Sequence, residues 1–418
     1  MKVVIVGAGA AGCFAAVEIK RRMPSADVTV VESGRRPLAK VAVTGGGRCN
    51  LTNSFEGVAG MESVYPRGAR IMKRLLKEFS HKDAYRWFES AGVRLTTQAD
   101  HCVFPVSQDA MEIVNTLLNL MRHHDVKLVT QQRITRIERT ESDANEVRYR
   151  LYAEQTAQGE RVFEATHVVV TTGGSPRIGG MKMYEALGLD IVEPVPSLFS
   201  FCLPNHPITQ LMGTVVDNTS ITLTGTKMKA SGPLLITHWG ISGPAVLKLS
   251  SYAARHLKEH DYKAVVSVNW FGQKTEAEVT EMLLELGIRN AHKQLHSVYP
   301  SCLNSRLWML LLESSGLRGD QRWGELARKS YCRLASRLTS HTLQIDGKNK
   351  FKEEFVTCGG VALGNVNAST LECRTLPGVY FAGEVLDVDA ITGGFNLQAA
   401  WTMAYVVAKS CSESMCRQ

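Results

Sequence analysis

A glycine-rich turn between an apolar strand and a helix is the feature that most constrains this 418-residue chain. Val3 to Val6 is apolar at every position, which is typical of a strand buried on both faces. The turn Gly7–Gly12 (GAGAAG) follows at once, and Cys13 to Arg22 then predicts a helix. A second apolar strand, 28–31, ends on Glu32, twenty residues after the last glycine. This order of strand, glycine turn, helix, strand and acid predicts a dinucleotide-binding Rossmann unit.

Each glycine of the turn has a physical task in such a unit. Gly7 makes the tight turn, Gly9 lets a pyrophosphate approach the backbone, and Gly12 lets the helix pack closely on the strand. We expect the phosphates on the free N–H groups of the helix N-terminus, and the ribose hydroxyls on Glu32. The alternative is a strand–helix turn without a ligand. The turn alone does not distinguish FAD from NAD.

A second glycine motif lies near the other end of the chain. The apolar run 379–382 predicts a strand, and Gly383 and Glu384 follow at its carboxyl end, where α/β sheets bind ligands. The sequence 392–394 (TGG) then opens a predicted helix, whose N-terminus would stabilise negative charge on a flavin pyrimidine ring. Two glycine turns so far apart favour one extended cofactor held at both ends. FAD fits that description.

Composition and charge indicate a globular protein and do not predict a nucleic-acid-binding groove. With 44% hydrophobic and 21% charged residues, the chain is typical of globular proteins. Its net charge of +8 comes from scattered cations with short clusters such as Arg67 to Arg74. We interpret these as solvated surface, so no stable nucleic-acid partner is expected, and the partner is a small-molecule substrate. The sequence gives no oligomeric state.

The cysteines and the apolar runs bear on the compartment. Ten cysteines without a CxxC pair or a metal-ligand spacing indicate reduced thiols, a cytoplasmic protein and no metal site. Apart from the run that contains the first glycine turn and ends at Glu18, no apolar stretch approaches the length of a membrane span. No membrane association is therefore expected.

The pattern changes twice along the chain. A third buried strand, 168–170, ends in a glycine turn; strands and turns dominate after Pro194, and helices dominate from about 275. Around Phe351 to Phe355 the strand-and-glycine pattern returns. We predict an α/β fold, in which a Rossmann-type FAD domain is interrupted by an insertion. The predicted segments are 1–194 and 345–418 for the FAD domain, 195–272 for a β-rich subdomain, and 273–344 for a small helical subdomain.

Four longer motifs resemble a bacterial family of FAD-dependent oxidoreductases whose members include aminoacetone oxidase and the flavin-dependent dehydro-bile-acid reductase. The motifs are Lys40–Asn53 (KVAVTGGGRCNLTN), Thr237–Pro244 (THWGISGP), Thr357–Val361 (TCGGV) and Gly383–Gln398 (GEVLDVDAITGGFNLQ). The resemblance implies a glutathione-reductase-like FAD domain with a two-part insertion, in agreement with the segments above. One departure is Ala390, where the family usually has glycine.

The candidate cofactor-binding residues come from these motifs and from the ends of the predicted strands. They are Gly7, Gly9, Ala10, Ala11, Gly12, Glu32, Ser33, Lys40, Gly46, Gly47, Arg48, Asn50, Thr52, Arg133, Ile134, Thr172, Gly173, Gly174, Gly383, Glu384, Gly394, Asn396 and Leu397. Asp387 and Asp389 are further polar candidates on the loop after Glu384.

Three side chains are candidates for the chemistry itself. Arg48 is expected to face the substrate or the flavin, with a structural ion pair as the alternative. His238 lies in a glycine- and proline-rich loop and is a candidate proton donor, although a structural role is the stronger expectation. Cys49 follows Arg48, and a nearby cation lowers a thiol pKa, but buried packing is the stronger expectation. The catalytic acid is not identified.

Three functions stay open. The first is a reductase or dehydrogenase of a small organic substrate, with hydride transfer through flavin N5 and NAD(P)H as a transient donor, since no second GxGxxG follows a strand. The second is an oxygen-using amine-type oxidase that releases peroxide. The third is a flavoprotein with a nucleic-acid- or protein-binding role. The resemblance favours the first.

Overall fold

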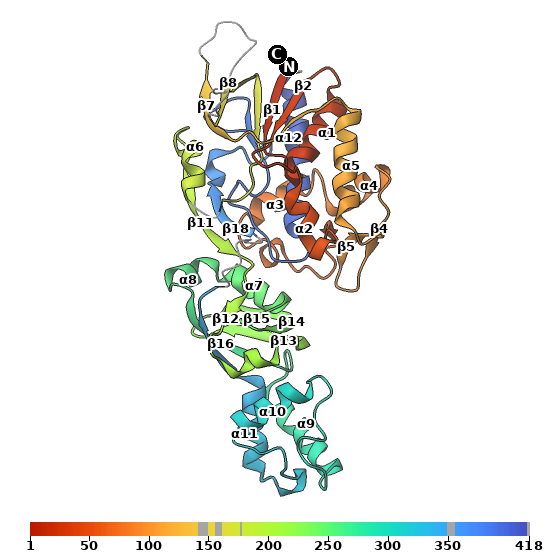
Figure 1. Cartoon of the computed structure of the whole chain (residues 1–418), viewed down its shortest axis with the longest axis vertical. Coiled ribbons are helices and arrows are strands. Elements are labelled where there is room, and N and C mark those ends of the chain that lie inside the picture. Colours follow the sequence, from red (N-terminus) through yellow and green to blue (C-terminus); the bar gives the residue numbers. More distant parts are fainter. Residues whose placement is uncertain (141–148, 155–160, 176–177, 349–355, 416–418) are drawn as a thin grey trace. The chain divides into compact units, whose positions relative to one another are not determined.

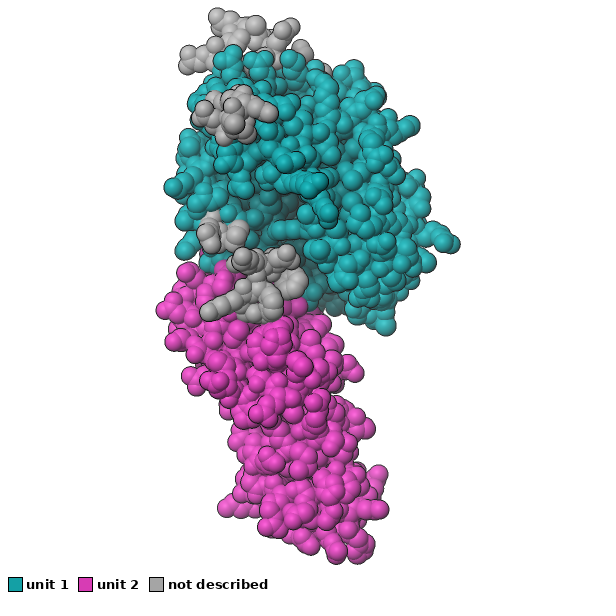
Figure 2. All heavy atoms as spheres, in the orientation of Figure 1, with its two compact units in different colours: residues 1–195, 356–418 teal, residues 196–355 magenta. Residues whose placement is uncertain are grey.

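The computed structural model describes residues 1–418 except 141–148, 155–160, 176–177, 349–355 and 416–418 (Figure 1). The chain forms two compact units, which Figure 2 colours separately. Unit 1 consists of Met1–Val195 and Val356–Gln418, and unit 2 of Pro196–Phe355.

Unit 1 is built on a five-stranded sheet in which all neighbouring strands are parallel. Its order is β19 (Val379–Phe381), β10 (His167–Val170), β1 (Lys2–Val6), β2 (Asp27–Val31) and β6 (Lys127–Val129). Val6 lies opposite Val170 and Val31, and Val170 lies opposite Phe381. The three strands β1, β10 and β19 therefore end at one edge of the sheet. The glycine turns that follow them lie at that edge.

Helices and three small sheets complete unit 1. The core between α1 (Ala10–Arg22) and α12 (Phe395–Met415) is aromatic, with the Phe14 and Trp401 ring centroids 5.5 Å apart. The other helices are α2 (Ala39–Gly47), α3 (Ala69–Leu75), α4 (His81–Ser90), α5 (Ala110–His123) and α6 (Lys182–Glu185). The small sheets contain β3 (Thr52–Asn53), β5 (Cys102–Pro105) and β4 (Leu95–Thr97); β7 (Ile134–Arg139), β8 (Tyr149–Ala153) and β9 (Val162–Ala165); and β11 (Ile191–Ser197) with β18 (Val356–Val361).

Unit 2 is a six-stranded antiparallel sheet with helices packed on it in one hydrophobic core. Trp270, Trp308 and Trp323 are fully buried in that core, and the rings of Trp308 and Trp323 stack with centroids 6.1 Å apart. The strands in sheet order are β12 (Phe201–Cys202), β15 (Gly240–Ser242), β14 (Lys229–Thr237), β13 (Val215–Leu223), β16 (Lys263–Asn269) and β17 (His341–Asp346). The helices are α7 (Pro244–Tyr252), α8 (Ala254–Glu259), α9 (Glu276–Arg289), α10 (Ser305–Ser314) and α11 (Arg328–Thr339).

The structure changes some details of the predicted organisation. The chain leaves unit 1 after Val195 and returns at Val356 instead of 345, because β17 pairs with β16 in the sheet of unit 2. The strand-rich segment also contains the helices α7 and α8, since Pro244 occupies the first turn of a helix, where its missing N–H costs no bond. The pattern at 351–355 lies outside the described residues. Within the described part of the chain, no helix combines the length and the apolar character that a membrane crossing needs.

Candidate cofactor and active site

The first glycine turn has the geometry that its sequence predicts. Gly7 has a φ of +107°, and a Cβ there would lie 2.5 Å from the Thr171 carbonyl oxygen. A Cβ on Gly12 would lie 2.0 Å from the Gly7 carbonyl oxygen, so any side chain would separate α1 from β1. A Cβ on Gly9 would meet no atom within 4 Å. Two of the glycines thus permit close backbone packing, and Gly9 faces open space.

The backbone at this turn is arranged to receive an anion. Gly9 caps α1 without a side-chain hydrogen bond, and in the described structure the N–H groups of Ala10, Ala11 and Gly12 donate to no protein acceptor. Such free amides at a helix N-terminus bind phosphate. The Glu32 carboxylate accepts hydrogen bonds from the N–H groups of Ala8 (2.8 Å) and Gly34 (2.6 Å). The acid at the end of β2 is therefore fixed beside the turn.

Three further candidates lie around Glu32. The Ser33 hydroxyl is 3.2 Å from a Glu32 carboxylate oxygen, and the Gln132 N–H donates to the Glu32 carbonyl oxygen (2.9 Å). The next two residues are Arg133, which is exposed, and Ile134, which is buried at the start of β7. Residues from 32 to 34 and from 131 to 134 thus lie side by side at this end of the turn.

The triple glycine, 45–47, forms the end of α2, where the backbone leaves helical geometry from Thr44 to Gly46. Gly46 and Gly47 have φ angles of +70° and +82°, and a Cβ on either would meet no atom within 4 Å. The exposed Arg48 guanidinium lies over the Phe104 ring, 4.5 Å from its centroid, and its Nε donates to the Gly45 carbonyl oxygen (3.1 Å). Burial raises the pKa of the Cys49 thiol to about 12. Cys49 is fully buried, in agreement with the packing expected for it, and burial disfavours the thiolate.

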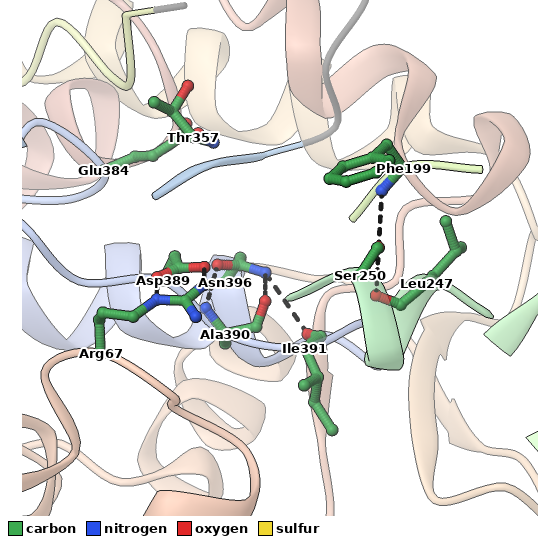
Figure 3. A network of polar contacts seen from close by, with 10 residues as sticks. All are labelled: Arg67, Phe199, Leu247, Ser250, Thr357, Glu384, Asp389, Ala390, Ile391 and Asn396. Atoms are coloured by element: carbon green, nitrogen blue, oxygen red, sulfur yellow. Dashed lines mark hydrogen bonds and ion pairs between the residues drawn. The ribbon is translucent and has the colours of Figure 1, made fainter. Parts of the chain in front are cut away.

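The motif after β19 contacts the other glycine turns. The Glu384 carboxylate accepts hydrogen bonds from the Thr357 N–H (2.7 Å) and from Lys40 Nζ (3.1 Å) (Figure 3 shows the first pair). A Cβ on Gly174 would lie 2.7 Å from a Glu384 carboxylate oxygen, so only glycine allows this approach. The φ of Gly173 is +75°, and the Thr172 hydroxyl is bonded to Tyr184 (2.7 Å). Lys40 and Glu384, 344 residues apart, are thus brought together.

The N-terminus of α12 is joined to the segment after the triple glycine. With its side-chain amide turned so that both ends find a partner, Asn50 donates to the Thr52 carbonyl oxygen (3.1 Å) and accepts from the Gly394 N–H (3.2 Å). The Thr52 hydroxyl donates to Gln398. Within the described residues, the N–H groups of Phe395, Asn396 and Leu397 donate to no protein acceptor. Like α1, α12 therefore begins with free amides that favour negative charge.

Two side chains shape the loop before α12. The Asn396 amide donates to the Ala390 carbonyl oxygen and accepts from the Ala390 N–H, both at 2.9 Å (Figure 3). Ala390 has no positive φ, so alanine in place of the family's glycine causes no backbone strain here. Asp389 is fully buried and forms a two-pronged ion pair with Arg67 (Figure 3). Burial acts to lower the pKa of Arg67, but the bonds and charge of Asp389 outweigh it and hold that pKa above its usual value.

The Arg67–Asp389 pair was missed in the sequence, where Arg67 was part of a basic cluster and Asp389 was a candidate ligand. Nothing local connects two residues 322 positions apart.

His238 lies in unit 2, in the exposed turn between β14 and β15, with its ring 4.3 Å from that of Trp239. Its place in the chemistry stays a prediction.

One cluster in unit 2 has metal-ligand chemistry that the cysteine-based reading of the sequence did not cover. His256, Glu259 and His260 offer ligand atoms within 4.8 Å of one another. Their spacing along the chain, i, i+3 and i+4, is the signal that would have found them, since it places three side chains on one helical face. The His256 and His260 rings stack with centroids 4.3 Å apart.

The site in unit 1 fits FAD. Two helices begin with unsatisfied amides, and Gly9, Gly46 and Gly47 leave space where side chains would otherwise stand. An acid is fixed at each end of the site, Glu32 near the first turn and Glu384 near the last. A pyrophosphate matches the N-terminus of α1, and a flavin ring that gains negative charge matches that of α12.

Comparisons with known proteins agree with this geometry. The model of the HI0933-like protein Rossmann domain family matches residues 1–410. The 3-dehydro-bile acid delta(4,6)-reductase of Clostridium scindens is 29% identical, with 98% of each chain covered. The ribosomal RNA dihydrouridine synthase of Haemophilus influenzae is 27% identical, again with 98% of each chain covered.

Solved structures show the same fold at low identity. The 3-ketosteroid-delta4-(5alpha)-dehydrogenase of Rhodococcus jostii RHA1 has a TM-score of 0.51 and 14% identity, with 98% of this chain and 96% of that chain covered. Family, fold and site geometry agree on a flavin enzyme. The chain belongs to the HI0933-like Rossmann family and is an FAD-dependent oxidoreductase.

Proposed function

We propose that this enzyme is an NAD(P)H-linked reductase of a carbon–carbon double bond conjugated to a carbonyl group. The substrate class rests on the two relatives discussed below. The mode of donor binding rests on the described residues, which form one parallel nucleotide-binding sheet, while every strand pair of the large sheet in unit 2 is antiparallel. FAD would occupy the one nucleotide site of the described residues. A nicotinamide donor therefore binds transiently at the active site, without a Rossmann domain of its own.

Residues of unit 1 have distinct tasks in this proposal. The amides of Ala10 to Gly12 hold the pyrophosphate, Glu32 holds the adenosine ribose, and Glu384 holds the ribityl chain. The N-terminus of α12 stabilises negative charge at the pyrimidine end of the ring. When bound, FAD supplies hydride transfer at N5. Arg48, exposed beside Gly46 and Gly47, donates hydrogen bonds to the carbonyl oxygen of the substrate and so favours hydride addition to the conjugated carbon.

Two relatives support the substrate class. Their names, a 3-dehydro-bile acid delta(4,6)-reductase and a ribosomal RNA dihydrouridine synthase, describe substrates that look unrelated. A 3-oxo steroid unsaturated at C4 and a uracil ring nevertheless share one chemical group, a C=C bond conjugated to a carbonyl. Reduction of that group is the common reaction, and uracil in RNA is one member of the proposed class.

The oxidative half-reaction tests this proposal. The FAD-loaded protein is photoreduced without oxygen. It is then mixed with 4-androsten-3-one, with oligonucleotides that contain uridine, or with air, while the flavin absorbance is followed. We expect at least one conjugated substrate to reoxidise the flavin faster than air does. Rapid reoxidation by air alone, with peroxide released, would contradict the proposal and favour the amine-type oxidase.

A further inference from the structure

A basic helix face in unit 1 has no task in the flavin site. Arg70, Lys73, Arg74 and Lys77 are spaced i, i+3, i+4 and i+7, which places them on one face of α3 and of the turn after it. All four side chains are exposed. The opposite face packs into the core through Ile71, Met72 and Leu75, so the helix cannot turn its cations inward.

These cations border a hollow of about 410 Å³. Its one acidic lining residue, Glu78, is paired with Lys409 (2.8 Å), and Arg74 is bonded to the neutral Ser369 hydroxyl (3.1 Å). Among the residues that the structure describes, no carboxylate lies within 4 Å of the cationic atoms of the four residues on the α3 face. Their charges are therefore available to an anionic partner.

The basic face is attached to the cofactor loop. Arg67, just before α3, makes the buried ion pair with Asp389. Gly68 has a φ of +77°, and a Cβ there would lie 2.6 Å from a Val388 methyl group. The backbones of Arg67 and Asp389 also form a β-bridge. A ligand on α3 is thus held at a fixed distance from the loop that opens α12.

We infer that this face of α3 docks the phosphate backbone of single-stranded RNA. The four residues stand at separate positions along α3 and the turn after it, and neighbouring positions on a helix face have Cβ atoms about 5–6 Å apart. Such a spread of charge suits a row of phosphates better than a single one. The choice of RNA rests on the proposed function, because uracil belongs to the proposed substrate class and occurs in RNA. The sequence alone predicts solvated surface for the cluster from Arg67 to Arg74. Its exposed cations instead position the RNA.

The test compares binding of a fluorescein-labelled 20-nucleotide RNA to the FAD-loaded wild type and to a triple variant, Arg70→Gln/Lys73→Gln/Lys77→Gln, by fluorescence anisotropy between 50 and 200 mM salt. A matched triple variant, Lys82→Gln/Arg94→Gln/Arg122→Gln, removes three exposed charges elsewhere on unit 1. We expect the α3 triple variant to bind at least tenfold more weakly at 50 mM salt. Its log–log salt slope should be about 2 smaller, since each single-strand phosphate contact contributes about 0.7. The matched variant should stay within about threefold of wild type.

Several results would overturn the inference. Equal weakening in both variants would mean non-specific attraction, and unchanged binding in the α3 triple variant would place the RNA elsewhere. Displacement of the RNA by NADPH but not by NADH would assign the face to the 2′-phosphate on the adenosine ribose of NADPH. Flavin reduction by NAD(P)H in the α3 triple variant is measured separately. If that reaction fails in wild type as well, the proposed function fails while the binding result still stands.

Discussion

The two units owe their structures to different kinds of contact. In unit 1 the decisive contacts are between backbones, as at Gly12, where no Cβ fits against the Gly7 carbonyl oxygen. In unit 2 they are between large side chains, as in the stack of Trp308 on Trp323. A backbone requirement confines a position to glycine, so it appears in the sequence as a short motif. A packed core tolerates many side-chain combinations of similar volume, so it appears in the sequence only as a diffuse apolar pattern.

The largest effect is expected where the backbone requirement is strictest. Gly12→Val forces α1 away from β1, because its Cβ would stand 2.0 Å from a carbonyl oxygen. The loss should exceed about 3 kcal/mol of unfolding free energy and leave little folded protein. Urea unfolding of purified protein, followed by circular dichroism, measures it.

Gly9→Ala is the matched control at the same turn. Its Cβ meets no protein atom within 4 Å and its φ is −84°, so the apoprotein should keep its stability. FAD should nevertheless bind at least tenfold more weakly, because the methyl group stands where the pyrophosphate approaches. Unchanged FAD affinity would show that the pyrophosphate lies elsewhere.

The second prediction compares two fully buried tryptophans, one in each unit. Trp308→Ala should destabilise unit 2 by about 3–5 kcal/mol and leave FAD bound, whereas Trp401→Ala in α12 should release FAD at lower urea concentration than wild type. Flavin fluorescence reports release of the cofactor, and tryptophan fluorescence reports unfolding. Loss of FAD at the same urea concentration in both variants would show that the units unfold as one.

This contrast explains what could be predicted from the sequence. The unit of β1, the first glycine turn, α1 and β2 with Glu32 was predictable, because its steric and hydrogen-bonding needs lie within about thirty residues. The pairing of Lys40 with Glu384 and that of Arg67 with Asp389 join positions more than 300 residues apart and leave no local pattern. α7 was missed because Pro244 was read as a turn residue and not as the start of a helix.

The third prediction concerns pH and unit 2. Burial, together with the charges of Arg337 and His206, lowers the pKa of His341 from 6.5 to about 4. The unfolded chain binds a proton on His341 more readily than the folded chain does. Above pH 6.5 His341 is neutral in both states, so its protonation does not reduce the free energy of unfolding. About 3 kcal/mol of it is lost as the pH falls from 6.5 to 4.

Comparison with His341→Gln isolates this contribution. Wild type should lose more stability than the variant between pH 6.5 and 4.5, as measured by urea unfolding at each pH through tryptophan fluorescence. Parallel pH profiles for the two proteins would show that His341 does not cause the acid sensitivity of unit 2.

The smallest effect is expected at Cys49, beside the flavin loop. Its buried thiol, with a pKa of about 12, should react with iodoacetamide at pH 8 more slowly than the exposed Cys302. Cys49→Ala should change the rate of flavin reduction by less than about twofold. Mass spectrometry of alkylated peptides and stopped-flow absorbance measure the two quantities. A loss of more than tenfold in rate would assign the thiol a catalytic role.

FAD held by two distant glycine motifs and reduced by a transient nicotinamide is the central claim for this enzyme. An anaerobic absorbance spectrum of the purified protein, taken before and after NADH and then NADPH, tests it most directly. We predict oxidised-flavin bands that bleach with one of the two nucleotides. Absence of flavin bands after incubation with FAD would contradict the cofactor assignment, and bands that persist with both nucleotides would contradict the nicotinamide-linked reductase.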